Sequence, residues 1–309
     1  MKLKNIHLLI LLAICWGPSF LFIKLALIEL NPIMLSVLRI GLGALILNVI
    51  LLLKRNYLPG NWSFWKDSAI AAFFSVAFPF LLITWGQQYI DSSLGSLLNG
   101  TTPFFTVIFS MLLLSNERLS GNKIRGVVIG FIGLLVLVYP NFSDDVNASF
   151  WGIMAVVLAS ASYGVGWVWV KKRLTSIASF KAPAAQLLIA TFYLLPIVYV
   201  IDPAISISNL SSMTMGSVVF LGVFGTALAF ILYFKLIEQA GASYASMVTY
   251  LVPVIGVFLG VVVLNETITS WMLAGALLIL YGIYIGGKKQ VKVCCPEESI
   301  DVRSFSKFR

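Results

Sequence analysis

The chain has 309 residues, of which 60% are hydrophobic and 11% are charged, and its net charge is +9. Charged residues are too few to cover a soluble globular domain, so the composition excludes a soluble protein and indicates a polytopic membrane protein. The basic residues lie in the breaks between apolar runs, where they report membrane orientation and not nucleic-acid binding.

Ten apolar runs follow one another along the chain. A transmembrane helix needs roughly 20 apolar residues, with a range of about 17–25. The fifth run is the weakest because Pro140 ends it early. The sequence therefore predicts an all-α polytopic membrane protein with ten transmembrane helices. The runs cover residues 6–27, 33–53, 68–88, 93–115, 124–139, 149–170, 182–201, 214–236, 243–264 and 270–286.

Charge placement predicts the orientation of these helices. With the N-terminus in the cytoplasm, every Lys and Arg except Lys24 and Arg39 falls on the cytoplasmic side, and acids such as Glu29 and Glu266 fall outside. This pattern follows the positive-inside rule. We expect a multi-pass protein of the cell (inner) membrane with cytoplasmic N- and C-termini and a basic cytoplasmic tail at 287–309.

The chain carries an internal repeat. The motif W-G-x-x-F-x-x-x-K, which begins at Trp16, returns as Y-G-x-x-W-x-x-x-K, which begins at Tyr163, at an offset of 147 residues. The two repeats cover 6–139 and 149–286, with five helices each. Because five is odd, the second repeat enters the membrane from the opposite side. The sequence predicts two inverted five-helix repeats around a central cavity.

Pro103 and Pro253 hold equivalent positions near the middle of the fourth and ninth runs, at an offset of 150 residues. Proline in a helix frees the carbonyl four residues back, here those of Asn99 and Thr249. Matched interruptions of this kind point to a binding site between the repeats. A pair of structural kinks, satisfied by nearby Ser and Thr, is the alternative. The polar binding candidates at these interruptions are Asn99, Thr102 and Tyr250.

Aromatic pairs mark the first and sixth runs. Trp16 and Phe20 are four residues apart, as are Tyr163 and Trp167, so each pair shares a helix face. Both pairs lie near mid-membrane, away from the interfacial belt that Trp and Tyr usually occupy. We expect Trp16, Tyr163 and Trp167 to line the cavity. An aromatic seam between packed helices is the alternative.

Arg39 lies well inside the second run, and its repeat counterpart is the neutral Gln186. A charge inside the membrane faces the helix bundle or water. A guanidinium fits a substrate carboxylate, but we favour a gating or structural role for Arg39, Gln186, Pro103 and Pro253. Lys24 lies closer to the surface, where its side chain can extend to the interface.

Glycine and glutamate pairs mark the closing run of each repeat. Gly126 and Gly130 in the fifth run, and Gly282 and Gly286 in the tenth, have the G-x-x-x-G spacing that lets helix backbones approach closely, within the chain or between two copies. Glu117 and Glu266 precede the two closing runs, where a carboxylate is favourable at a helix start.

These marks resemble the ten-helix drug/metabolite transporter superfamily, in particular its EamA-type members. They are the motif at Trp16, Arg39 in the second run, Pro103 in the fourth, the turn at 116–119 and the glycine-rich closing run. The resemblance covers about 6–286 as two EamA-like units. It implies an inner-membrane carrier with a cavity open alternately to each side. Members of the family mostly export or facilitate amino acids and other small metabolites, and their substrates are too diverse for the resemblance to assign one to this chain. The second repeat departs from the pattern where 265–268 lacks the basic residue of the first turn.

The leading hypothesis is therefore a secondary transporter that works by alternating access. It moves a small polar metabolite, with amino acids among the candidates, as an exporter or facilitator. A lipid or lipid-linked substrate flippase is the alternative. An enzyme is not expected, because no nucleophile or zinc motif occurs. One histidine and three cysteines give no metal spacing, so neither a metal nor a cofactor is expected. The expected partners are a small-molecule substrate and the lipid bilayer, with no nucleic acid, in a monomer or homodimer.

Overall fold

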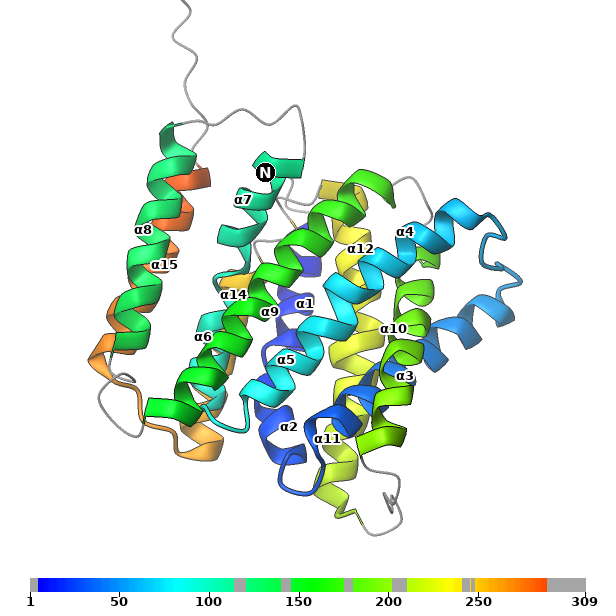
Figure 1. Ribbon diagram of the computed structural model, residues 1–309, viewed down its shortest axis with the longest axis horizontal. Helices are drawn as coiled ribbons and strands as arrows, with labels where there is room; N and C mark the ends of the chain where they lie inside the picture. Colours follow the sequence, from blue (N-terminus) through cyan, green and yellow to red (C-terminus); the bar gives the residue numbers. More distant parts are fainter. Residues whose placement is uncertain are drawn as a thin grey trace, which may run out of the picture.

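The computed structural model describes residues 5–113, 121–139, 146–174, 180–201, 210–240, 245 and 248–287, and the regular elements in these ranges are helices (Figure 1). The first repeat contains α1 (Ile6–Trp16), α2 (Ser19–Ala26), α3 (Pro32–Leu53), α4 (Trp62–Ala72), η2 (Phe73–Ala77), α5 (Phe78–Gly86), α6 (Ser92–Asn99), α7 (Thr102–Leu113) and α8 (Gly121–Val138). The second contains α9 (Val146–Arg173), α10 (Lys181–Ile201), α11 (Ser212–Gly222), η5 (Val223–Leu228), α12 (Ala229–Ala240), α14 (Val248–Leu264) and α15 (Ser270–Gly287).

These elements form ten membrane-crossing units, as predicted from the sequence. Seven helical segments of the described chain are long and apolar enough to cross a membrane. The other three are shorter apolar helices, at 124–138, 248–264 and 270–282, and they correspond to the predicted fifth, ninth and tenth runs. The weakness of the fifth run in the sequence thus appears in the structure as a shorter apolar helix.

The close contact of α8 with α15 demonstrates the inverted repeat. A Cβ atom at Gly133 would lie 2.9 Å from the carbonyl oxygen of Gly275, and one at Gly282 would lie 2.7 Å from that of Gly126. The two contacts exchange under the repeat, since Gly126 corresponds to Gly275 and Gly133 to Gly282. The helices are antiparallel, and a two-fold axis crosses them at right angles. The glycines therefore serve packing within the chain.

Other helix pairs obey the same two-fold relation. The helices α3 and α10 are repeat counterparts and pack on each other, and the fourth and ninth spans, which are also counterparts, pack through α6 and α14. The packing of α7 on α9 is matched by that of α14 on α1, and the packing of α4 on α10 by that of α11 on α3. The two repeats interlock in this way, while α8 and α15 stand side by side at the left edge of Figure 1.

Local sequence explains where several helices begin and end. Asn31 caps α3 by accepting a hydrogen bond from the Met34 amide at 2.8 Å, and Pro32 occupies the first turn, where its missing N–H costs nothing. The first span is interrupted at Gly17 and Pro18, between α1 and α2. In that region the side-chain amide of Gln87 donates a hydrogen bond through Nε2 to the Phe20 carbonyl at 3.0 Å. The equivalent span of the second repeat, α9, is continuous.

In the described residues, each repeat contains one π-helical segment in its third span, which the sequence pattern does not predict. The two segments, η2 and η5, begin at equivalent positions, Phe73 and Val223, 150 residues apart. A π-helical turn leaves backbone groups without their usual partners and is often found at functional sites. Ser75 of η2 lines the cavity between the repeats, and η5 contacts Arg39, which lines the same cavity.

Candidate functional site

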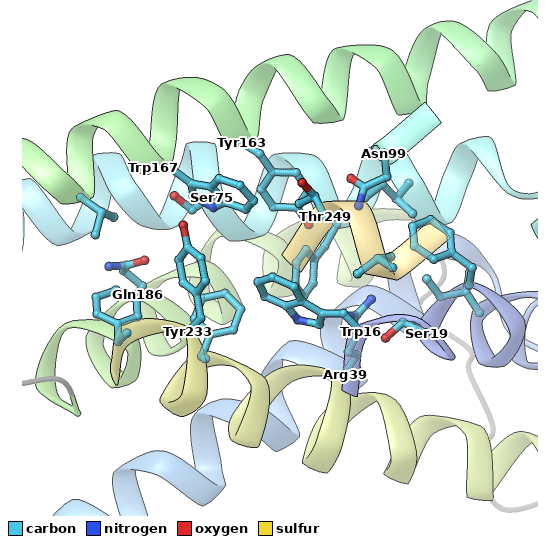
Figure 2. A pocket seen from close by; sticks show the side chains of 18 residues that line it. Trp16, Ser19, Arg39, Ser75, Asn99, Tyr163, Trp167, Gln186, Tyr233 and Thr249 are labelled. Carbon is cyan, nitrogen blue, oxygen red and sulfur yellow. The ribbon is translucent and has the colours of Figure 1, made fainter. Parts of the chain in front are cut away.

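A cavity lies between the two repeats, and its wall draws on both (Figure 2). It is lined by residues of α1, α2, α3, η2, α5 and α6 from the first repeat and of α9, α10, α12 and α14 from the second. Its described polar lining residues, aromatic hydroxyls apart, are Ser19, Arg39, Ser75, Asn99, Gln186 and Thr249.

Aromatic side chains from both repeats meet in the cavity (Figure 2). The rings of Trp16 on α1 and Trp167 on α9 are parallel within 5°, with centroids 6.5 Å apart. Tyr233 on α12 contacts both indoles, with centroid distances of 5.4 Å and 5.2 Å. Tyr163 lies 5.5 Å from Trp167. These four rings join the repeats and give the cavity π faces, which attract cations and stack on flat groups.

Arg39 is buried at the cavity wall and holds the π-helical segment of the other repeat. Its Nε donates a hydrogen bond to Thr226 Oγ1 at 3.0 Å, and its Nη2 donates to the Gly225 carbonyl at 3.3 Å. The guanidinium carbon lies 4.1 Å from the centroid of the Phe80 ring. Among the described residues these contacts use two of the five N–H donors of the fork, so the other donors are available to a ligand.

The counterpart of this arrangement in the other repeat lacks its hydrogen bonds. Gln186 is equivalent to Arg39, and Ser75 in η2 is equivalent to Gly225. Within the described chain, neither amide atom of Gln186 has a hydrogen-bond partner, nor have the hydroxyls of Ser75 and Tyr233. All three side chains are buried. Figure 2 shows them near one end of the cavity, with Arg39, Asn99 and Ser19 toward the other.

The fourth span is interrupted beside the cavity, between α6 and α7. The Asn99 carbonyl, which Pro103 leaves without a backbone donor, accepts a hydrogen bond from Thr102 Oγ1 at 2.7 Å. This is the local satisfaction that the kink interpretation expects. A Cβ atom at Gly100 would lie 3.2 Å from Pro253 Cγ, so the two proline-bearing spans meet at the interruption.

The structure brings most of the predicted site residues together. Trp16, Asn99, Tyr163 and Trp167 line the cavity, and so do Arg39 and Gln186. The described lining does not include Thr102, Tyr250, Pro103 or Pro253. The Thr102 hydroxyl is engaged with the Asn99 carbonyl. Tyr250 follows Thr249 on α14, and neighbouring helix positions differ by about 100°, so the two side chains point in different directions.

Sequence reasoning missed Ser19, Ser75 and Tyr233. Ser75 and Tyr233 belong to the third and eighth spans, where the motifs drew no attention. A polar side chain in an apolar run was the available signal, but Ser68 gives the same signal and is not among the described lining residues. The packing of the helices places Ser75, and not Ser68, among the described residues that line the cavity.

Glu266 closes the face of the bundle opposite to the one where α1 begins. Its carboxylate accepts hydrogen bonds from the backbone amides of Ser92 and Ser93, both at 2.8 Å, and from the Ser93 hydroxyl. The sequence predicts that Glu266 caps its own closing helix, but Glu266 caps α6 of the other repeat, because the 265–269 turn brings it to the α6 N-terminus. In the described chain, Thr269 accepts from the Met272 amide of α15 at 3.2 Å. Glu117, which is the counterpart of Glu266 in the first repeat, lies outside the described residues.

Electrostatics at this face follow from the same contact. Burial would raise the pKa of Glu266, but the hydrogen bonds from Ser93 and Ser92 outweigh it and hold the pKa below its ordinary value of 4.5. Burial and the neighbouring Glu266 charge raise the pKa of Asp91, and Lys24 opposes them. Folding of this face thus favours an ionised Glu266.

A bundle of membrane-spanning helices, built as two inverted repeats around a cavity that both repeats line, defines a membrane transporter. The chain belongs to the EamA-like transporter family, whose model matches residues 3–139 and again residues 150–286. This is a family of transporters and not of enzymes, as the sequence predicted.

Relatives share nearly the whole length of the chain. It is 28% identical over 277 residues to the "Uncharacterized transporter YoaV" of Bacillus subtilis, covering 90% of this chain and 94% of that one. It is 28% identical over 295 residues to a "Probable amino-acid metabolite efflux pump" of Salmonella typhimurium, covering 92% and 95%. A protein of the same description from Escherichia coli is 27% identical over 308 residues, covering 95% and 99%. A solved crystal structure matches with a TM-score of 0.68 at 18% identity, covering 93% and 98%, and shows the fold alone.

Proposed function

We propose that the protein is a secondary transporter that exports a small polar metabolite, with amino acids foremost, or lets it pass down its gradient. The observation that carries the proposal is the buried Arg39, which lines a cavity between the repeats and uses two of its five N–H donors in hydrogen bonds to the described residues. Two of the similar proteins bear names that refer to amino-acid metabolites, which supports the same substrate class.

The cavity offers complementary groups to a zwitterion. The remaining donors of Arg39 suit a carboxylate. Of the described lining residues, Arg39 is the one that is charged at neutral pH, so an ammonium group would rest on the aromatic faces of Trp16, Trp167 and Tyr233. The proposed binding residues are Trp16, Asn99, Tyr163 and Trp167, and Arg39 both positions η5 and attracts the anionic group. Thr102 and Pro103 shape the interruption between α6 and α7. Tyr250 and Pro253 lie in α14, which continues through Pro253, so the interruption predicted there is absent from 248–264.

Alternating access requires contacts between the repeats that break in turn. At the face opposite the start of α1, Glu266 holds Ser92 and Ser93, and Glu29 accepts from the Ser211 amide at 2.9 Å. At the other face, Trp169 Nε1 donates to the Asp67 carbonyl at 3.2 Å. We propose that these two sets of contacts open in alternation, while α8 and α15 remain paired.

Transport from liposomes tests the proposal. Purified protein is reconstituted in liposomes loaded with labelled amino acids and other small polar metabolites. At least one should leave faster than from protein-free liposomes. Trp16→Ala and Asn99→Ala should slow this efflux at equal reconstitution, because both remove cavity groups. A broad panel without flux in either direction would contradict the proposal.

A lipid substrate is the second candidate, and one observation favours it. A largely apolar hollow lies between the third span and α10, lined by Trp62, Lys66, Phe73, Phe78, Tyr193 and Ile197 among others. It adjoins η2, whose Ser75 lines the central cavity. If lipid is the substrate, labelled lipid should cross the bilayer of the same liposomes while small solutes stay inside.

A further inference from the structure

One end of the central cavity contains polar groups that the described protein leaves without partners. Gln186 on α10 is fully buried, and neither its amide oxygen nor its amide nitrogen makes a hydrogen bond within the described chain. The hydroxyls of Ser75 in η2 and Tyr233 on α12 share that condition, with 3% exposure for each residue. Burying such groups without partners is costly, so each needs an explanation.

The repeat supplies a direct comparison. In the second repeat η5 is held by Arg39, whose fork reaches Gly225 and Thr226. For η2 in the first repeat, the residue equivalent to Arg39 is Gln186 on α10 of the second repeat. The residue of η2 equivalent to Gly225 is Ser75. The same backbone arrangement therefore has its hydrogen bonds made at one end of the cavity and left open at the other. This difference arises from three sequence changes, namely Gln186 for Arg39, Ser75 for Gly225 and Val76 for Thr226, and not from a different fold.

The open groups come from three elements and lie near the same end of the cavity (Figure 2). A carboxamide both donates and accepts hydrogen bonds, and each hydroxyl can do either. None of the three carries a charge at neutral pH, and Arg39 lies farther along the cavity. The chemistry that satisfies them is an uncharged group with hydrogen-bond donors and acceptors of its own.

We propose that Gln186, Ser75 and Tyr233 form a subsite that binds an uncharged hydrogen-bonding group of the substrate, either a carboxamide or a hydroxyl. The inference rests on the proposed function, since it assigns the part of the substrate farthest from the carboxylate that faces Arg39. A site that hydrogen-bonds a substrate group strongly rejects analogues that lack the group, because its own polar atoms then stay unpaired.

The test measures flux for pairs of amino acids of matched shape: glutamine with methionine, asparagine with leucine, and threonine with valine. In wild-type liposomes we expect the polar member of at least one pair to move at least about tenfold faster than its apolar partner. Gln186→Leu and Tyr233→Phe should each lower that ratio toward one. Ser68→Ala is the matched control, because Ser68 also has a buried, unpartnered hydroxyl in the described chain and is not among the lining residues.

The outcomes separate the subsite from the transport function. Equal fluxes within every pair would overturn the subsite and leave the transporter proposal standing. A wild-type preference that survives both Gln186→Leu and Tyr233→Phe would also overturn it, and would assign the open groups to ordered water. If Gln186→Leu fails to fold, the milder Tyr233→Phe, which removes one oxygen, tests the subsite alone. An unchanged flux ratio in Tyr233→Phe would then overturn the subsite. No flux of any amino acid or polar metabolite would sink the proposed function and the subsite together.

Discussion

The Nε atom of Arg39 on α3 donates a hydrogen bond to Thr226 Oγ1 at 3.0 Å, so a charged side chain of one repeat fixes the π-helical segment of the other. Thr226 also donates to the Leu221 carbonyl at 2.8 Å, five residues back, which satisfies an acceptor within the same span. A single hydroxyl thus links the charge to the backbone irregularity beside the cavity.

Thr226→Val should destabilise the protein, because it removes that hydroxyl and keeps the shape of the side chain. The Nε donor of Arg39 loses its acceptor, for a loss of about 1 kcal/mol in the free energy of unfolding. Thermal unfolding in detergent measures the change. Thr226→Ser, which retains the hydroxyl, should lie between wild type and Thr226→Val. Equal melting temperatures for Thr226→Val and wild type would show that the link contributes nothing.

Trp167→Ala should weaken substrate binding, because Trp167 supplies an aromatic face that is parallel to Trp16. We expect the half-saturating concentration for transport to rise about tenfold, as for the loss of a well-packed aromatic contact. Trp167→Phe should retain part of the affinity. Trp151→Ala removes an exposed indole of α9 that lines neither the central cavity nor the apolar hollow, and serves as the control. The proposal loses support if Trp151→Ala and Trp167→Ala have the same effect.

Glu266→Gln should loosen the face that Glu266 closes, with a definite pH dependence. The pKa of Glu266 is held below its ordinary value of 4.5 in the folded protein. The ionised carboxylate therefore stabilises the fold above about pH 4.5, and this stabilisation is lost as the pH falls through the lowered folded-state pKa. Wild type should melt at a higher temperature than Glu266→Gln at neutral pH, and the gap should close in strong acid. A gap independent of pH would argue against the carboxylate as its source.

Gly275→Ala should destabilise the α8–α15 pair. A Cβ atom at Gly275 would lie 2.5 Å from Leu137 Cβ and 2.8 Å from the Gly133 carbonyl oxygen, so the two backbones would have to separate. We expect a loss of about 1–3 kcal/mol, measured by thermal unfolding. Gly216→Ala on α11 is the control, since nothing lies within 4 Å of its added methyl. Equal unfolding temperatures for the two variants would contradict the close packing.

The charge distribution predicts that the face where α1 begins is cytoplasmic. Gly60→Cys and Ile28→Cys place a thiol on opposite faces, in a background with Cys294 and Cys295 replaced by Ser and with Cys15 buried. A membrane-impermeant maleimide added to spheroplasts should label Ile28→Cys and not Gly60→Cys. The reverse labelling would invert the proposed topology.

The sequence by itself determined the membrane class, the ten helices and the inverted repeat. These follow from local quantities, namely how apolar each run is, where the charges fall and how residues recur. It also identified four of the cavity residues, Trp16, Asn99, Tyr163 and Trp167, because their polar or aromatic character stands out in an apolar run. It placed Arg39 inside a span but did not identify Thr226 and Gly225 as its partners.

The tertiary structure decided which side chains meet across the repeats. Thr249 and not Tyr250 faces the cavity because helix rotation separates neighbours on α14. Glu266 caps α6 instead of its own helix because the turn before α15 crosses to the other repeat. The two π-helical segments, and with them the place of Ser75, pack against spans of the other repeat, η2 on α9 and α10 and η5 on α3. The pattern of residues along the chain does not predict such contacts, since they depend on the three-dimensional arrangement of all ten helices.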